Sequence, residues 1–340
     1  MELKDRINAF SLLGNQLTTW LEQIENKVEN PLTPVFHQAF HRNGWFEESQ
    51  IIWALKAVHS WLNTDSLEKW TSAYTFPEVI EPKVVGVIMA GNIPLVGFHD
   101  YLSVLISGNK LQAKLSSKDE VLLRFLHHEL LRIEPRFKSM VDFSTERFNN
   151  VNAIIATGSD NSSKYFEYYF SKKPHIIRRN RTSVAVLTGK EGKEEMNALG
   201  SDIFRYFGLG CRSVTKLFLP KGFDVDWFYS GIMAHGALIN NHKYQNNYDY
   251  HKSVFLLNGS KLWDNNFLLL KEDVALSSPV GTLFYEEYES LEEVESKLSE
   301  IQDQIQCRVG VGGFPLGGAQ NPELTDYSDN MDVLKFLLAL

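Results

Sequence analysis

The stretch Val84-Val85-Gly86-Val87-Ile88-Met89-Ala90-Gly91-Asn92-Ile93-Pro94 indicates the class of fold. It begins with a continuous apolar run, which is typical of a strand buried on both faces of a parallel sheet. Asn92 is predicted to cap the helix that follows, and Pro94 is tolerated in the first turn of a helix. The stretch therefore predicts a strand, a turn and a helix, which together form the repeating unit of an α/β fold.

The same alternation continues along the chain. Strands are predicted at 84–90, 110–115, 139–143, 151–157, 183–187, 213–220, 267–271, 281–288 and 306–311. Helices are predicted at about 47–61, 66–74, 94–108, 117–133, 193–207, 225–241 and 291–305, after an amphipathic helix near the N-terminus. A capping box at Ser117–Glu120 is expected to open the helix at 117–133. This order predicts a doubly wound, mostly parallel sheet with ligands bound beyond the carboxyl ends of its strands.

Composition narrows the class of protein. The 340 residues are enough for two domains, and a net charge of -8 argues against a nucleic-acid binder. Two cysteines do not make a disulfide framework, no secretory signal is visible, and a cytoplasmic setting is therefore expected. No apolar run reaches the roughly 18 residues of a membrane span. The histidine pairs lack a third ligand with suitable spacing, so no metal site is predicted.

One turn carries the clearest sign of chemistry. In Gly208-Leu209-Gly210-Cys211-Arg212-Ser213, two glycines let the backbone approach a neighbour or a ligand closely. A cysteine on such a turn presents its sulfur and its own N–H to the same small volume, which suits a nucleophile beside an oxyanion donor. The alternative is that Cys211 is simply a small buried apolar residue. Cys307 lies inside an apolar run and is interpreted as structural.

Four motifs, in order along the chain, resemble those of the aldehyde dehydrogenase superfamily. They are Gly86–Leu95, Ser107–Lys114, the turn Ala156-Thr157-Gly158-Ser159, and the glycine-cysteine turn at 208–213. Within the superfamily, the sequence is more similar to the acyl-CoA reductases of the LuxC type. This likeness rests on Gly-x-Gly-Cys-Arg-Ser, on Arg-Asn-Arg-Thr-Ser at 179–183 and on Asp-Tyr-Ser-Asp at 326–329.

The resemblance implies an α/β, aldehyde-dehydrogenase-like fold. A doubly wound, Rossmann-like cofactor domain would be joined to an α/β catalytic domain and preceded by a helical N-terminal segment. The boundaries expected are 1–75 for the helical segment, 76–200 for the dinucleotide-binding domain and 201–315 for the catalytic cysteine domain. The tail at 316–340 is expected to pack back on the body or on a neighbouring subunit.

The resemblance also implies roles for individual residues. Cys211 would be the nucleophile, and the Asn92 amide would join the Cys211 N–H in binding the oxyanion. Among the expected cofactor-binding residues, Lys114 would hold the adenosine ribose, and Gly158 and Ser159 would meet the pyrophosphate. Ser117 replaces the glutamate of NAD-preferring members, and Lys118 follows it. These last two residues predict NADPH as the cofactor, with NADH possible.

Two segments depart from the superfamily pattern. Hydrolytic members carry a glutamate base before the cysteine, whereas the segment 176–181, Ile-Ile-Arg-Arg-Asn-Arg, has no carboxylate. An enzyme without that base is poorly equipped to activate water against an acyl-enzyme. The nicotinamide-ribose motif Glu-x-Phe-Gly-Pro is replaced by Ala-Leu-Ser-Ser-Pro at 275–279. The basic run at 172–181 is interpreted as a solvated face, with contact to CoA phosphates as the alternative.

The function predicted is therefore acyl-CoA reduction: an acyl thioester, of fatty type by resemblance, is reduced to an aldehyde through a cysteine-bound acyl-enzyme. Two alternatives stay open, an NAD(P)-dependent aldehyde dehydrogenase and a catalytically inactive subunit of the same fold. The expected partners are a small-molecule acyl thioester and, by resemblance, further copies of the chain in a homo-oligomer. An acyl-carrier or synthetase protein remains open as a partner.

Overall fold

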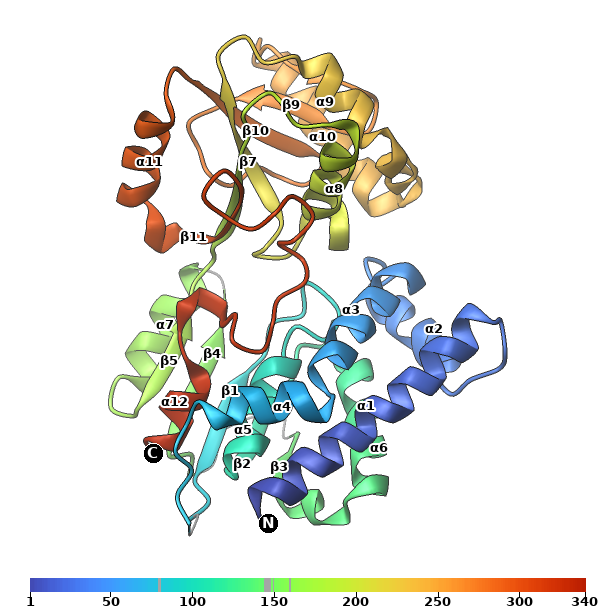
Figure 1. Ribbon diagram of the computed structural model, residues 1–340, viewed down its shortest axis with the longest axis vertical. Coiled ribbons are helices and arrows are strands. Elements are labelled where there is room, and N and C mark those ends of the chain that lie inside the picture. Colours follow the sequence, from blue (N-terminus) through green and yellow to red (C-terminus); the bar gives the residue numbers. More distant parts are fainter. Residues whose placement is uncertain (79–80, 144–147, 149, 159) are drawn as a thin grey trace. The chain divides into compact units, whose positions relative to one another are not determined.

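The computed structural model describes residues 1–78, 81–143, 148, 150–158 and 160–340 (Figure 1). The chain divides into two compact units. Unit 1 comprises Met1–Arg179 and Glu323–Leu340, and unit 2 comprises Asn180–Pro322. Each unit is built on a largely parallel sheet with helices, so the predicted α/β class is confirmed, as is the helical N-terminal region.

The sheet of unit 1 is parallel throughout its described strands, in the order β3-β2-β1-β4-β5. The strands are β1 Val84–Ile88, β2 Lys110–Lys114, β3 Val141–Asp142, β4 Ala153–Thr157 and β5 His175–Arg178. The sheet centre is formed by β1, as expected from its unbroken apolar run, and Val85 and Val87 are fully buried there. All carboxyl ends of these strands therefore meet at one edge, where ligands bind in open parallel sheets.

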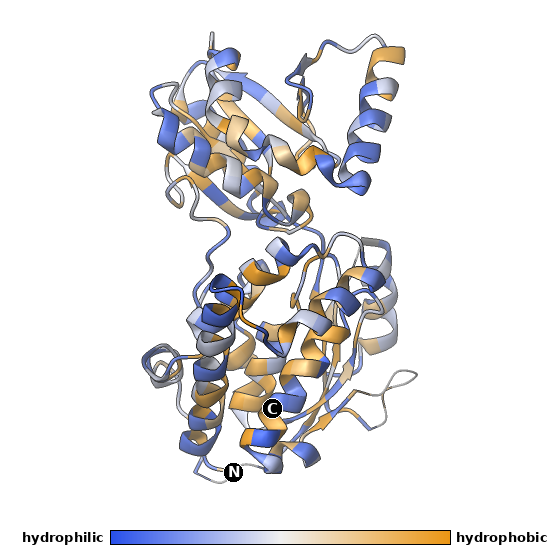
Figure 2. Cartoon of the chain, turned by 90° about the vertical axis from the view of Figure 1, so that its right-hand side faces the viewer, coloured by the Kyte–Doolittle hydropathy of each residue, from blue (hydrophilic) through white to orange (hydrophobic). Residues whose placement is uncertain are grey.

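Helices of unit 1 cover this sheet and extend beyond it. They are α1 Leu3–Glu25, α2 Leu32–Arg42, α3 Glu48–Trp61, α4 Thr64–Ser72, α5 Phe98–Ser107, α6 Val121–Ile133, α7 Asp160–Phe170 and α12 Val333–Leu338. The long helix α1 packs against α3, α5 and α6, and α12 packs against α5 (Figure 1). Within each unit, hydrophobic residues gather in the strands and on inward helix faces, as Figure 2 shows.

The sheet of unit 2 has the order β11-β6-β7-β10-β9-β8 among the described strands, and only the pair β8–β9 is antiparallel. Its strands are β6 Thr182–Val186, β7 Val214–Pro220, β8 Trp263–Asp264, β9 Leu269–Glu272, β10 Thr282–Tyr288 and β11 Ile305–Gly310. Its helices are α8 Lys193–Phe204, α9 Val225–Ile232, α10 His242–Leu257 and α11 Leu291–Glu300, with 3₁₀ helices η2 Arg205–Gly208 and η3 Met233–Asn240.

Both faces of this second sheet are covered. On one face, Ala185, Leu217 and other inward strand residues pack with α8 and α9 in the largest hydrophobic cluster of the unit. On the opposite face, Val184 and Phe218 pack with α11. Alternate residues of β6 and β7 thus point to opposite cores, as the period of a strand requires. The result is the doubly wound arrangement that the alternation predicted.

Two predicted helix starts are wrong. Asn92 does not cap α5, because that helix begins at Phe98 with Gly97 at the N-cap position. The capping box at Ser117–Glu120 does not form either, since α6 begins at Val121 and no side chain caps it. The reason lies in Asp119, whose buried carboxyl accepts hydrogen bonds from backbone N–H groups in the loop after β1 instead. The residues 116–120 therefore form a turn that ties two loops together.

Among the elements outside the predicted pattern are β5 and α10. The strand β5 was not predicted, although it pairs with β4 along its whole length. The predicted helix at 225–241 is in fact α9 followed by η3, and α10 comes after it. Few apolar residues mark α10, whose buried side chains are Tyr244 and Tyr248, so its hydrophobic period is weak. Asn241 caps it by accepting hydrogen bonds from the backbone N–H groups of Lys243 and Tyr244.

Candidate functional site

The backbone before Cys211 is strained. Tyr206, Phe207 and Gly208 follow one another in the left-handed region, with φ of 54°, 57° and 75°. A bulky residue in this region costs about 1–3 kcal/mol, and such strain tends to occur at functional sites. Burial of both aromatic side chains holds the turn, and the Leu209 N–H donates to the Tyr206 carbonyl at 3.1 Å. The chain thereby reverses as it leaves α8.

Cys211 lies on the following turn, just before the amino end of β7, and is partly exposed. The Ser213 N–H donates to the Gly210 carbonyl at 3.0 Å and closes the turn. The Ser183 hydroxyl donates to the Cys211 carbonyl at 3.0 Å. Neither cysteine is in a disulfide, and Cys307 is buried at 7% exposure. A partly exposed thiol on a tightly held turn is suited to nucleophilic chemistry.

The segment 317–320 is fastened to the residues around this turn. The fully buried Asp202 on α8 accepts hydrogen bonds from the N–H groups of Gly317 at 2.6 Å and Ala319 at 3.0 Å. The Arg212 guanidinium donates to the Ala319 carbonyl and lies 5.2 Å from the centre of the Phe314 ring. The residue after the nucleophile candidate is thus held by the same segment as the end of α8.

Asp202 makes the stability of this region pH-dependent. Burial raises the pKa of its carboxyl from 3.8 to about 6, against the opposing effect of the two N–H donors. Because the folded protein binds the proton more tightly, the stabilisation is greatest below pH 4 and is lost as the pH rises through 6. A difference of about two units between the folded and unfolded pKa values corresponds to roughly 3 kcal/mol of unfolding free energy.

We therefore expect the unfolding free energy of the native protein, relative to Asp202→Asn, to fall by up to about 3 kcal/mol between pH 4 and pH 7.5. Urea denaturation of both proteins at four pH values measures this difference, and contributions from all other groups cancel to first order. A difference that stays constant with pH would contradict the raised pKa.

The segment 275–279, which replaces the nicotinamide-ribose motif, also lies near the cysteine turn within unit 2. The Thr215 hydroxyl on β7 donates to the Leu276 carbonyl at 2.8 Å. A cavity of about 20 Å³ is lined by residues of both segments, including Phe207, Gly208, Ser278 and Pro279. That volume suits a single water molecule rather than a substrate.

In unit 1, Asn92, which is predicted to bind the oxyanion, lies at the carboxyl edge of the sheet together with predicted cofactor-binding residues. Asn92 is exposed on the loop after β1, and Lys114 is exposed at the end of β2. These two loops touch, since a Cβ atom at Gly91 would collide with the Ser116 side chain. Ser117 and Lys118 are exposed on the turn after β2. This grouping fits the rule that ligands of parallel sheets bind at the carboxyl ends.

The third loop of this edge follows β4. Gly158 lies between β4 and α7, and a Cβ atom there would come within 2.9 Å of Ser162 and of Phe166. Only a glycine therefore lets the chain pass this closely over the start of the helix. Ser159 lies outside the described residues. The exposed loops with their lysines, and the backbone held close to a helix start, fit a phosphate-bearing dinucleotide.

The segment that lacks the glutamate base holds a buried ion pair instead. Arg178, at the end of β5, donates two hydrogen bonds to the Asp100 carboxylate on α5, at 2.7 and 2.8 Å. Both side chains are 7% exposed. The interpretation of 172–181 as a solvated face is therefore wrong for Arg178. A carboxylate held by both oxygens in a buried bidentate pair is not available as a base.

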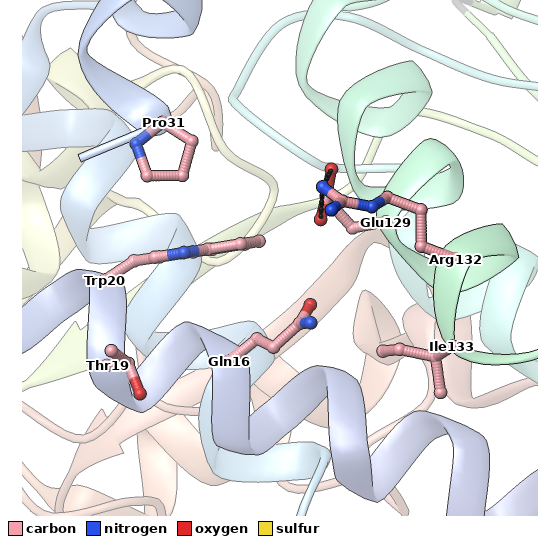
Figure 3. Close-up of a pocket in the computed structure, with 7 residues that line it drawn as sticks. All are labelled: Gln16, Thr19, Trp20, Pro31, Glu129, Arg132 and Ile133. Atoms are coloured by element: carbon pink, nitrogen blue, oxygen red, sulfur yellow. Dashed lines mark hydrogen bonds and ion pairs between the residues drawn. The ribbon is translucent and has the colours of Figure 1, made fainter.

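A larger cavity lies away from all these residues, between α1 and α6 in unit 1 (Figure 3). Its volume is about 420 Å³, and its lining is Gln16, Thr19, Trp20, Pro31, Glu129, Arg132 and Ile133. Figure 3 shows Trp20 and Gln16 of α1 facing the ion pair Glu129–Arg132, whose N–O distance is 3.4 Å. None of the predicted site residues lines it.

No group of three or more potential metal ligands occurs among the described residues.

Sequence reasoning missed three residues that shape these sites. Asp100 is the one acid in a largely buried helix, and Asp202 is an acid beside Leu199 and Ile203 on the buried face of α8. A lone acid on an apolar helix face is the signal that could have found both. Ser183 is the last residue of the motif at 179–183, but nothing in the sequence indicated which residues it contacts.

Among the described residues, no helix is both long enough and apolar enough to cross a membrane.

Comparison with solved structures shows the fold. Aldehyde dehydrogenase 21 from Physcomitrella patens, in complex with succinate, aligns with a TM-score of 0.68 and 11% identity, covering 100% of this chain and 84% of that one. An NAD⁺ complex of an aldehyde dehydrogenase from Bacillus cereus aligns with a TM-score of 0.61 and 13% identity, covering 91% and 72%. The NAD⁺-bound enzyme from Mycobacterium tuberculosis gives 0.64 and 12%, covering 91% and 73%.

Sequence comparison shows the family. No curated protein matches the chain. The family model described as acyl-CoA reductase (LuxC) matches residues 54–228, which is more than half of the chain and includes the glycine-cysteine turn. Family and fold together indicate an NAD(P)-dependent oxidoreductase that acts on a small acyl substrate. The chain belongs to the acyl-CoA reductase (LuxC) family, as the motifs around Cys211 predicted.

Proposed function

We propose that this protein reduces acyl-CoA thioesters to aldehydes with NADPH, and that Cys211 carries the acyl group between the two half-reactions. In the first, the Cys211 thiolate attacks the thioester carbonyl, a new thioester forms on Sγ, and the CoA thiolate leaves and takes up a proton. In the second, a hydride and a proton convert the enzyme thioester to an aldehyde and the free thiol. The sum is acyl-CoA, NADPH and H⁺ giving aldehyde, CoA and NADP⁺.

The observation that carries this proposal is the strained turn at 206–208. Strained backbone conformations cluster at functional sites. Here the strained turn places a partly exposed cysteine just before the amino end of the buried strand β7. A tetrahedral oxyanion needs donors that are already in position. We assign this role to the Cys211 N–H and the Asn92 side-chain amide.

The pair Arg178–Asp100 supports thiol exchange over hydrolysis. Release of an acid from an acyl-enzyme needs a base to activate water. Segment 176–181 has no carboxylate of its own, and Asp100 accepts both its hydrogen bonds from Arg178. An acyl-enzyme formed on Cys211 is therefore expected to await reduction rather than lose its acyl group to water.

Residues of the carboxyl edge in unit 1 are proposed to hold the dinucleotide, which when bound supplies the hydride. Lys114 would bind the adenosine ribose hydroxyls, and the backbone at Gly158 and Ser159 would meet the pyrophosphate beside the start of α7. The exposure of Lys114 and the tight glycine at 158 support this assignment.

NADPH is proposed over NADH because of Ser117 and Lys118. A serine hydroxyl can donate to a 2′-phosphate where a glutamate would repel it, and Lys118 adds a positive charge on the same turn.

We expect Ser117→Glu to weaken transition-state binding with NADPH, relative to NADH, by about 1–3 kcal/mol. The comparison is kcat/KM for both cofactors with one acyl-CoA. Ser117→Gln is the matched control, because glutamine equals glutamate in size but carries no charge. An unchanged ratio of kcat/KM for NADPH to kcat/KM for NADH in Ser117→Glu would show that Ser117 is not part of the cofactor site.

The experiment that tests the proposed function is product identification. The purified protein is incubated with acyl-CoA of several chain lengths and NADPH, and aldehyde, free CoA and NADP⁺ are quantified. We expect them in equal amounts. Oxidation of aldehydes to free acids without any reduction of acyl-CoA would favour the aldehyde dehydrogenase alternative. Absence of both activities would favour an inactive subunit.

A further inference from the structure

The strand β6 has irregular pairing on both sides at a single residue, Ser183. On the β11 side, Thr182 pairs with Ile305 and Val184 with Arg308, so one extra residue of β11 is accommodated opposite Ser183. On the β7 side, Ser183 pairs with Val214 whereas Val184 pairs with Lys216, so β7 also carries an extra residue. Such bulges re-aim side chains and are over-represented beside active sites.

At this irregular position, the fully buried Ser183 hydroxyl makes hydrogen bonds to both Cys211 and Cys307. Its Oγ lies 3.0 Å from the Cys211 carbonyl oxygen and 3.0 Å from the Cys307 Sγ, and the Cys307 N–H donates to it at 3.2 Å. A hydroxyl has one proton to donate, and a carbonyl oxygen can only accept. The proton of Ser183 therefore goes to Cys211, and the Cys307 thiol donates its own proton to Ser183.

From this geometry we propose that Ser183 is a positioning residue for the nucleophile, and that Cys307 orients Ser183. The inference rests on the proposed function, in which Cys211 attacks the substrate. The strained turn is held upstream by the hydrogen bond from Leu209 to the Tyr206 carbonyl, and Ser183 holds it downstream at the Cys211 carbonyl. Without this second anchor, the strain at 206–208 can relax by moving the peptide groups around Cys211.

Small movements of a reacting group have large kinetic effects, since a displacement of about 1 Å can cost 100-fold in rate. The arrangement also gives Cys307 a role beyond packing. A thiol is a weak donor, yet in this position its S–H and its backbone N–H together fill the acceptor sites of the serine oxygen and leave the hydroxyl proton directed at Cys211.

The test compares Ser183→Ala, Ser183→Thr and a matched control, Ser103→Ala. Ser103 is also fully buried and donates to a backbone carbonyl, that of His99 at 2.7 Å, but lies in unit 1 on α5. Measured quantities are kcat and KM for acyl-CoA, and the melting temperature. For Ser183→Ala we expect kcat to fall about 10- to 100-fold with KM changed less than threefold. Ser183→Thr keeps the hydroxyl and should regain most of kcat even though its added methyl group lowers stability.

A structural role alone would give a different pattern. If Ser183→Ala keeps kcat within threefold of Ser103→Ala, or if Ser183→Thr is as slow as Ser183→Ala, the positioning role is wrong. Should Ser183→Ala not fold, the Cys307 pair decides: Cys307→Ala, which lacks a donor, must be slower than Cys307→Ser, which keeps one. Equal kcat for those two would overturn the inference. Cys211→Ser distinguishes a failure of the positioning role from a failure of the proposed function. Full activity of Cys211→Ser would show that Cys211 is not the nucleophile.

Discussion

Cys211→Ala is expected to lower aldehyde formation from acyl-CoA by about 10⁴-fold or more, as removal of a covalent nucleophile does in other enzymes. The thiolate is the only group assigned to form a bond with the substrate, so both half-reactions depend on it. Cys211 is partly exposed, and the hydrogen bonds that hold its turn are made to backbone carbonyls, which alanine keeps, so the alanine variant should melt within a few degrees of the native protein.

Two measurements locate the defect. Intact-mass spectrometry after mixing with acyl-CoA, in the absence of NADPH, should show one acyl adduct on the native protein and none on Cys211→Ala. Iodoacetamide should inactivate the native enzyme by alkylating Cys211, since Cys307 is buried and its thiol is hydrogen bonded to Ser183. Inactivation that tracks alkylation of Cys307 instead would show that the nucleophile has been misassigned.

The central part of the fold could be predicted because burial on both faces leaves a simple trace. Strands such as β1 and β4 are unbroken apolar runs, and their order with the helices implies a parallel sheet. The cysteine turn could be found for a similar reason, since Gly208, one of its two closely spaced glycines, lies in the left-handed region that favours glycine. What was visible in both cases is a local requirement on consecutive residues.

Tertiary interactions account for the parts that were missed. The capping box at Ser117–Glu120 satisfied the local rule, yet Asp119 is held by the loop after β1 and the helix starts later. The bond between Ser183 and Cys307 spans 124 residues, and the pair Arg178–Asp100 spans 78. No periodicity or spacing reports such pairs. The roles of Asn92, Lys114, Ser117 and their neighbours also stay predictions, because each depends on a bound molecule.

Among these roles, that of Asn92 has the largest expected effect after the nucleophile. Its side chain is exposed on the loop after β1, and α5 begins only at Phe98, so the residue has no part in capping that helix. Loss of one donor to a developing oxyanion typically costs about 10²–10³-fold in rate. We therefore expect Asn92→Ala to slow acylation of Cys211 by about 10²–10³-fold, at nearly unchanged stability.

The acylation step can be measured alone, as release of CoA in a single turnover without NADPH. Asn26→Ala is the matched control, because Asn26 is also an exposed asparagine of unit 1 and its side-chain amide donates to the Glu22 carbonyl at the end of α1. Binding of NADPH, followed by fluorescence titration, should be the same in native protein and Asn92→Ala, since the amide is assigned to the acyl oxygen and not to the dinucleotide. A variant with normal CoA release but weakened NADPH binding would move Asn92 from the oxyanion site to the cofactor site.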